Sequence, residues 1–151
     1  STPVENMGVA FSAGYTYAFF PEIEKIILEN NQATGTVILK NDQIPEIPPF
    51  EARLKATYLL FGDRLKPGFE TRAVAGQNAV SEASYEESTP GYVIADLTID
   101  FKPYTWFTIA TGVNNLFNKA YYDHLNRRLA GTTGDLYEPG RTFFVNLIIR
   151  I

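Results

Sequence analysis

Hydrophobic and polar residues alternate along six stretches of this chain with a period of two. Such a period is typical of β-strands, because successive side chains of a strand point to opposite faces. The clearest stretch is 50–61, where the even positions are apolar or aromatic and the odd positions begin with Glu51, Arg53 and Lys55. The other five stretches are residues 8–19, 69–80, 92–101, 106–113 and 141–151. The pattern predicts an all-β fold, an antiparallel up-and-down meander of about six strands.

The connections between these predicted strands alternate between long and short. The long connections are residues 20–49, 81–91 and 114–140, and the short ones are 62–68 and 102–104. In the first long connection, Asn30-Asn31 lies between two apolar runs and predicts a hairpin extension. Pro21 is expected to end the first strand, and Gly62-Asp63 with Pro67-Gly68 to form the first short turn. Short turns at one rim and long loops at the other are typical of outer-membrane β-barrels.

The second short turn, Lys102-Pro103-Tyr104, also predicts the register of the two strands that it joins. Ile99 would lie opposite Phe107, and Leu97 opposite Ile109. In this register the apolar faces of the two strands coincide, as the burial of one face requires.

The strand faces opposite the apolar set carry charges of both signs. These residues are Glu51, Arg53, Lys55, Glu70, Arg72, Asp96, Asp100 and Arg150. A wet lumen tolerates mixed charges that can pair, so we expect the apolar faces to point to lipid and the charged faces to point inward. A soluble β-sandwich or a soluble ligand-carrying β-barrel would instead bury the same apolar faces in its interior. The alternation alone leaves this alternative open.

Composition and charge exclude several classes of protein. Aromatic residues make up 14% of the 151 residues, which suits β-strands and the aromatic girdles of membrane barrels. The net charge of -4 provides no basic surface for nucleic acid. The absence of cysteine excludes disulfides and thiolate metal sites. No apolar run reaches about eighteen residues, so no transmembrane helix is predicted.

The start and the strand number predict that residues 1–151 are a piece of a longer protein. The opening Ser1-Thr2-Pro3 lacks the charged start and apolar core of an export signal. Six strands are also fewer than the roughly eight of the smallest membrane barrels.

Two motifs in the last third of the chain resemble those of a known family. The first is Gly-Val-Asn-Asn-Leu-Phe-Asn-Lys-Ala-Tyr-Tyr at 112–122, and the second is Tyr-Glu-Pro-Gly-Arg-Thr-Phe at 137–143. Together with residues 47–54 and 81–101, they are similar to the C-terminal end of TonB-dependent outer-membrane receptors. The resemblance spans nearly the whole chain. One departure is Ile151, where the family usually ends in an aromatic residue.

The resemblance implies a fold, a location and a function. Residues 1–151 would form the last six strands of a large transmembrane barrel of about 22 strands, without the plug domain and the earlier strands. Such receptors lie in the outer membrane of Gram-negative bacteria and import a scarce ligand, such as a siderophore, another metal chelate or haem. The implied partners are this ligand, the lipid bilayer, the plug and remaining strands of the same receptor, and a TonB-type energy-coupling system. No cofactor is implied.

Candidate ligand contacts lie in the last long connection, and they are Tyr121, Tyr122, Asp123, His124, Arg127 and Arg128. Imidazole and carboxylate groups suit transition metals, and guanidinium groups suit anionic chelates. With one histidine and no cysteine, however, we favour a surface histidine packed against loop aromatics, and no metal site. The two arginines are expected to be solvated or to pair with Asp123 and Glu138. The acidic loop 81–87 is expected to be hydrated.

A second candidate group lies on the charged strand faces. It comprises Arg53, Lys55, Asp96 and Asp100, which we expect to form a structural network. By the resemblance, the same residues could instead contact the plug.

No pattern in the sequence points to catalysis. A phosphate-binding glycine loop, an HExxH pattern and a GxSxG elbow are all missing. A hydrolase would need converging histidine, serine and acidic side chains, and a single histidine leaves little to build from. We therefore expect no enzymatic activity.

Overall fold

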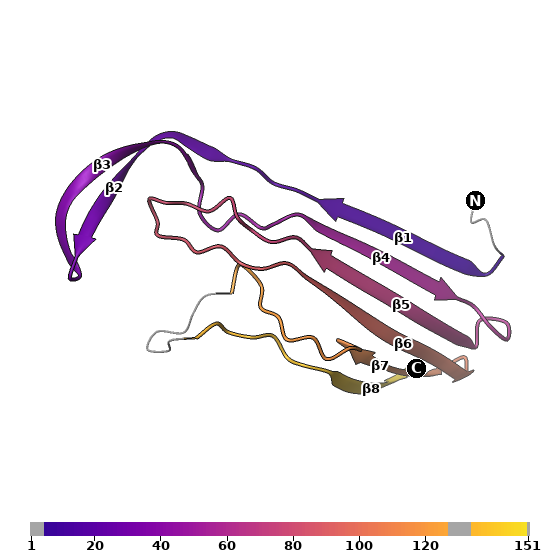
Figure 1. Cartoon of the computed structure of the whole chain (residues 1–151). Coiled ribbons are helices and arrows are strands. Elements are labelled where there is room, and N and C mark those ends of the chain that lie inside the picture. Colours follow the sequence, from indigo (N-terminus) through magenta and orange to yellow (C-terminus); the bar gives the residue numbers. More distant parts are fainter. Residues whose placement is uncertain (1–4, 127–133, 151) are drawn as a thin grey trace.

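The computed structural model describes residues 5–126 and 134–150 (Figure 1). Every regular element in these residues is a β-strand, and they include no helix long and apolar enough to cross a membrane. The strands are β1 (Met7–Gly14), β2 (Phe19–Glu29), β3 (Gln32–Gln43), β4 (Glu51–Tyr58), β5 (Leu65–Val74), β6 (Tyr92–Tyr104), β7 (Phe107–Asn114) and β8 (Thr142–Ile149). Six of them form one antiparallel sheet in the order β1-β4-β5-β6-β7-β8, and β2 pairs with β3 alone. The predicted six-strand meander and its hairpin extension are confirmed.

The sheet has its short turns at one end and its long connections at the other (Figure 1). Only Thr105 and Trp106 separate β6 from β7, whereas residues 75–91 separate β5 from β6. The hairpin of β2 and β3, here called the arm, projects past the long-loop end of the sheet (Figure 1). Its turn is formed by Asn30 and Asn31, which have positive φ angles of 49° and 61°. Two left-handed residues are what a tight hairpin turn requires, and asparagine tolerates that conformation.

One face of the sheet is apolar and open. Phe11 in β1, Val93 in β6 and Val145 in β8 are 70%, 61% and 66% exposed. The strand registers place these three positions on the same face. Within residues 5–126 and 134–150 no second layer covers this face, so they do not form the sandwich or closed soluble barrel of the alternative prediction. An exposed apolar surface of this extent is typical of contact with a membrane or a partner.

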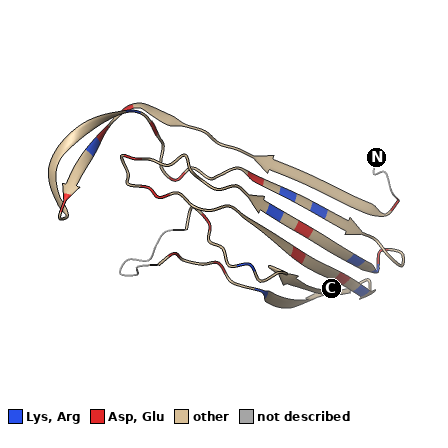
Figure 2. Ribbon diagram, viewed as in Figure 1, with Lys and Arg blue, Asp and Glu red and all other residues tan. Residues whose placement is uncertain are grey.

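The strand registers place the charged residues of β4, β5 and β6 on the opposite face. Figure 2 marks their positions along these strands. The carboxylate of Glu70 lies 3.8 Å from Nη1 of Arg53 and 3.6 Å from Nζ of Lys55. Glu51 accepts hydrogen bonds from Nε of Arg53 and, at 2.8 Å, from Nε of Arg72. Acids and bases on neighbouring strands therefore alternate in one connected network.

A small hydrophobic cluster lies on this charged face near the long-loop end. Val74, Tyr92 and Ile94 form a small buried cluster, against which Tyr121 packs from the connection after β7. The rings of Tyr92 and Tyr121 have centroids 4.3 Å apart. The start of the last long connection therefore folds back over the sheet.

The register between β6 and β7 differs from the prediction. Leu97 lies opposite Val113 and Ile99 opposite Thr111, a shift of four residues along β7. Strands β6 and β7 extend through the predicted turn and are joined by only two residues. The pairing is irregular between Phe101 and Tyr104, because Pro103 has no N–H to donate. Because the shift is even, the apolar faces still coincide.

Two predicted strands have other bounds in the structure. The first, predicted at residues 8–19, ends at Gly14. Strand β5 begins at Leu65 and includes Pro67-Gly68, since the preceding turn uses positive φ angles at Phe61, Gly62 and Asp63. A side chain at Gly68 would place its Cβ 2.6 Å from Oγ1 of Thr98, so close strand approach explains this glycine. Strand β5 also ends at Val74 and not at residue 80.

Pro21 was expected to end the first strand, and it lies instead inside β2. The pairs on either side are Phe20 with Asp42 and Glu22 with Lys40. Pro21 itself makes no pair there, because the chain opposite turns at Asn41, which has a φ of 56°. The missing N–H of proline is tolerated where the ladder is already interrupted.

Candidate functional site

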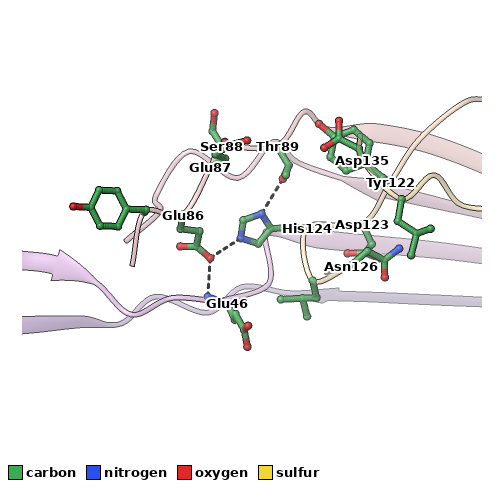
Figure 3. Close-up of a pocket in the computed structure, with 13 residues that line it drawn as sticks. Glu46, Glu86, Glu87, Ser88, Thr89, Tyr122, Asp123, His124, Asn126 and Asp135 are labelled. Atoms are coloured by element: carbon green, nitrogen blue, oxygen red, sulfur yellow. Dashed lines mark hydrogen bonds and ion pairs between the residues drawn. The ribbon is translucent and has the colours of Figure 1, made fainter. Parts of the chain in front are cut away.

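The long connections meet around a pocket of about 300 Å³ (Figure 3). Its walls come from the connection after β3, from the loop between β5 and β6 and from the connection after β7. Among its lining residues are Glu46, Glu86, Thr89, Tyr122, His124 and Asn126. The pocket is thus built from segments far apart in the sequence.

Asp42, near the end of β3, fixes the arm to the loop between β5 and β6. Its carboxylate accepts hydrogen bonds from the Ser81 hydroxyl at 2.8 Å, from the Glu82 amide at 2.8 Å and from the Ala83 amide at 3.1 Å. Burial acts to raise the pKa of Asp42, but these hydrogen bonds outweigh it and hold the pKa below the ordinary carboxyl value. The ionised carboxylate organises the start of this loop into a turn.

The arm makes further contacts with the same loop. Nζ of Lys25 lies 3.0 Å from the carboxylate of Glu82 and 4.6 Å from the centroid of the Tyr85 ring. The Tyr85 hydroxyl donates to the carbonyl of Ile26 at 2.7 Å. The acidic loop 81–87 was expected to be only hydrated, and this expectation is wrong because the loop holds the arm.

Glu86 joins three segments. Its Oε1 accepts a hydrogen bond from the Glu46 amide at 2.7 Å and lies 3.2 Å from Nε2 of His124. Its Oε2 accepts from the Ser81 amide at 2.7 Å. Figure 3 shows the carboxylate between Glu46 and the imidazole. Both oxygens of one side chain are therefore engaged by groups of the long connections.

His124 is a buried side chain and not the predicted surface histidine. Its side chain is 3% exposed. Nδ1 lies 3.0 Å from Oγ1 of Thr89, while Nε2 faces Glu86. The imidazole thus contacts two residues of the loop between β5 and β6. In the described residues, no group of three or more His, Cys, Asp or Glu is placed to hold a metal ion.

Asp123 connects the same segment to the sheet. Its carboxylate lies 2.9 Å from Nη2 of Arg72 and accepts a hydrogen bond from the Tyr92 hydroxyl at 3.2 Å. Burial acts to raise the pKa of Asp123, but the Arg72 guanidinium and the Tyr92 hydroxyl hold it below the ordinary value. Burial and the nearby Glu138 carboxylate raise the pKa of Tyr121, whose ring packs against Tyr92. Asp123 is therefore ionised, and the neighbouring phenols of Tyr92 and Tyr121 are neutral.

The asparagines of the 112–122 motif organise the exit from β7. Asn115 is buried and has a φ of 52°. Oδ1 of its side-chain amide accepts a hydrogen bond from the Lys119 N–H at 2.8 Å. Nδ2 donates to the Lys119 carbonyl at 2.8 Å and to the Pro139 carbonyl at 3.4 Å. Oδ1 of Asn118 accepts from the Arg141 N–H at 2.9 Å, at the entry to β8. Both asparagines therefore fix backbone turns through hydrogen bonds between side chain and backbone.

Comparison with known families decides where this chain belongs. Residues 5–116 match the family described as "TonB dependent receptor-like, beta-barrel". The chain belongs to this family. The receptor barrel family consists of transport receptors and not of enzymes. A comparison with curated proteins found no match.

Solved structures show the same fold. This chain is similar to the copper transporter OprC, with a TM-score of 0.73 and 22% identity over 98% of this chain and 22% of OprC. The siderophore receptor PiuA from Acinetobacter baumannii has a TM-score of 0.65 and 16% identity, over 97% of this chain and 20% of PiuA. The ferric-catecholate import receptor Fiu from K12 E. coli has a TM-score of 0.60 and 17% identity, over 97% of this chain and 19% of Fiu. The chain thus spans about a fifth of each structure.

The remaining predicted residues of the receptor barrel segment take different places. Tyr122 lines the pocket, and its ring lies edge-on to Tyr137 with centroids 5.4 Å apart. Arg127 and Arg128 lie outside the described residues. Glu138, one of their expected partners, accepts a hydrogen bond from the side chain of Asn126.

The predicted lumen residues lie on the charged face. Arg53 and Lys55 belong to the ion-pair network of β4 and β5. The carboxylate of Asp96 accepts a hydrogen bond from the backbone N–H of Asn115 at 2.7 Å. Asp100 lies opposite Lys66 in the pairing of β5 and β6.

Sequence reasoning missed Asp42 and Glu86, which hold the pocket segments together. Both looked like ordinary loop carboxylates. The only local signal was the Ser-Glu-Ala-Ser run at 81–84, because serine hydroxyls often close turns.

Proposed function

We propose that residues 1–151 form the C-terminal part of the barrel of an outer-membrane receptor. In this proposal the whole receptor imports a scarce ligand across the outer membrane of a Gram-negative bacterium. The observation that carries it is the family match over residues 5–116, on a sheet with one apolar and one charged face. The open apolar face suits contact with lipid, and the long connections suit the outer rim of a barrel.

We further propose the partners of this segment. The edges of β1 and β8 pair with the remaining strands of the same receptor, because an open sheet edge is not tolerated in lipid. The charged face points to the plug, and Arg53, Lys55, Asp96 and Asp100 either support the barrel wall or contact the plug. A TonB-type system would supply energy through that plug.

The cargo that we propose is a metal chelate, a siderophore, haem or a similar complex. The three similar structures are named for copper, siderophore and ferric-catecholate transport. In this proposal the ligand contacts come from the predicted set around the pocket. Three of them, Tyr122, Asp123 and His124, line the pocket. The whole proposed set is Tyr121, Tyr122, Asp123, His124, Arg127 and Arg128.

Deletion of the complete gene in its host tests the proposal. The deletion strain and a complemented strain are compared for uptake of radiolabelled copper(II), a ferric catecholate and haem under metal limitation. We expect loss of uptake of one probe, restored by complementation and abolished again when the energy-coupling protein is removed. Unchanged uptake of all probes, or recovery of the protein in the soluble fraction, would contradict the proposal and favour a soluble ligand-binding module.

A further inference from the structure

We propose that Glu86 is a positioning residue that couples three outer segments of the receptor into one body. The segments are the connection after β3, the loop between β5 and β6, and the connection after β7. The inference rests on the proposed function only in assigning these segments to the outer, ligand-facing side. The coupling itself stands on the contacts of one carboxylate.

The two oxygens of Glu86 have separate tasks. Oε1 reaches out of its own loop, to the Glu46 amide at 2.7 Å and to Nε2 of His124 at 3.2 Å. Oε2 remains within the loop and accepts from the Ser81 amide at 2.7 Å. The Glu86 side chain is 14% exposed, so water competes little for these bonds. One oxygen therefore joins segments, and the other shapes the loop.

Each coupled segment is also fixed at a second point. Asp42, four residues before Glu46, is bonded to residues 81–83. Asp123, next to His124, is paired with Arg72 of the sheet at 2.9 Å. A movement of any one segment therefore strains contacts of the other two.

The pocket depends on this coupling. Glu46, Glu86 and His124 all line it, one from each segment (Figure 3). Without the Glu86 carboxylate, Glu46 and His124 are no longer joined through one side chain, although Asp42 and the contact of His124 with Thr89 still hold their segments. A ligand that draws the His124 wall inward would then draw the Glu46 wall less, because the direct set of contacts between them is broken.

Hydrogen exchange followed by mass spectrometry on the full-length receptor in nanodiscs tests the coupling without any ligand. Glu86→Ala should raise amide exchange by about tenfold in all three segments, the factor expected for loss of about 1.4 kcal/mol of local protection. His124→Ala should raise exchange at 86–89 and 121–126. The double variant should add little to the larger single effect, because both changes break the same contact. Ser88→Ala, an exposed pocket residue of the same loop, is the matched control and should change nothing.

Glu86→Gln tests the coupling of the segments separately from the shape of the loop. It also serves as a second variant if Glu86→Ala does not fold. Its single amide oxygen can keep the two bonds of Oε1, while its NH₂ group then faces the Ser81 amide and cannot accept from it. We expect raised exchange at 81–84, with the other two segments protected as in the unchanged receptor. Exchange that rises only within 81–87 in Glu86→Ala would overturn the proposal. The readout needs no transport, so failure of the proposed function and failure of the coupling are distinguishable.

Discussion

The guanidinium of Arg72 lies 2.9 Å from the carboxylate of Asp123, although 51 residues separate them in the sequence. Arg72 stands on the charged face of β5, and Asp123 comes from the connection after β7. Arg72 also binds Glu51 of β4. A single arginine thus holds the connection after β7 to two strands of the sheet.

Asp123→Asn should weaken this attachment. An asparagine keeps the shape but loses the charge, and Arg72 retains Glu51, so we expect a loss of about 1–3 kcal/mol in the free energy of unfolding. Urea unfolding of the full-length receptor in detergent measures it. Asp63→Asn, in the exposed turn between β4 and β5, is the control and should leave the midpoint unchanged. Equal midpoints for both variants would show that the ion pair contributes nothing.

Gly112→Ala should disturb the contact between β6, β7 and β8. A Cβ at this position would lie 2.5 Å from the Leu97 carbonyl and 2.7 Å from the Phe144 ring, so backbone has to move. We expect destabilisation of about 1–3 kcal/mol, visible as a lower temperature at which the folded band disappears in a gel-shift assay. Gly14→Ala, with no atom within 4 Å of its new Cβ, is the control. A larger effect at Gly14 than at Gly112 would contradict this account.

The attachment of the arm should depend on pH through Asp42. The pKa of Asp42 is lower in the folded protein than its ordinary value, so its stabilisation is complete above the ordinary pKa and is lost as pH falls through the folded pKa. We expect a spin label at Thr34→Cys, in the arm, to be immobile at neutral pH and to gain mobility below about pH 4. Asp42→Asn should be mobile at every pH, because its NH₂ group faces amide donors. If the mobility of the label changed neither with pH nor with Asp42→Asn, Asp42 would not be the residue that attaches the arm.

Asn115→Ala and Asn115→Asp should differ in effect. Alanine loses all side-chain bonds to Lys119 and Pro139, whereas aspartate keeps the one accepted from the Lys119 N–H. We expect alanine to lower the free energy of unfolding by about 2 kcal/mol and aspartate by less. Thermal unfolding of the full-length receptor compares them. If alanine proved no worse than aspartate, the buried amide would not be what fixes this turn.

The two faces of the sheet could be predicted because a period of two is visible in one sequence. The register of β6 and β7 could not, since a shift of four residues leaves Leu97 and Ile99 on the same face. The start of β5 was hidden because Pro67-Gly68 reads as a turn. Only the neighbouring strand shows why a glycine is needed at position 68, where Thr98 approaches.

The site was predicted less well than the sheet. The sequence indicated that 121–124 carry aromatic, acidic and imidazole groups, but not that Asp123 returns to Arg72. His124 meets Glu86 across 38 residues, and no local pattern encodes such a distance. Partners of buried polar groups are settled by the folded arrangement and not by periodicity.

The contacts of the arm also set an order of events during assembly. Asp42 and the Glu46 amide belong to the first long connection, yet their partners lie in residues 81–86, some forty residues later in the chain. His124, which completes the cluster at Glu86, follows later still. Contacts between distant residues form slowly, because the intervening chain must first be closed into a loop. The arm can therefore be secured only after the loop between β5 and β6 has been synthesised, and the cluster at Glu86 is complete only once His124 has followed.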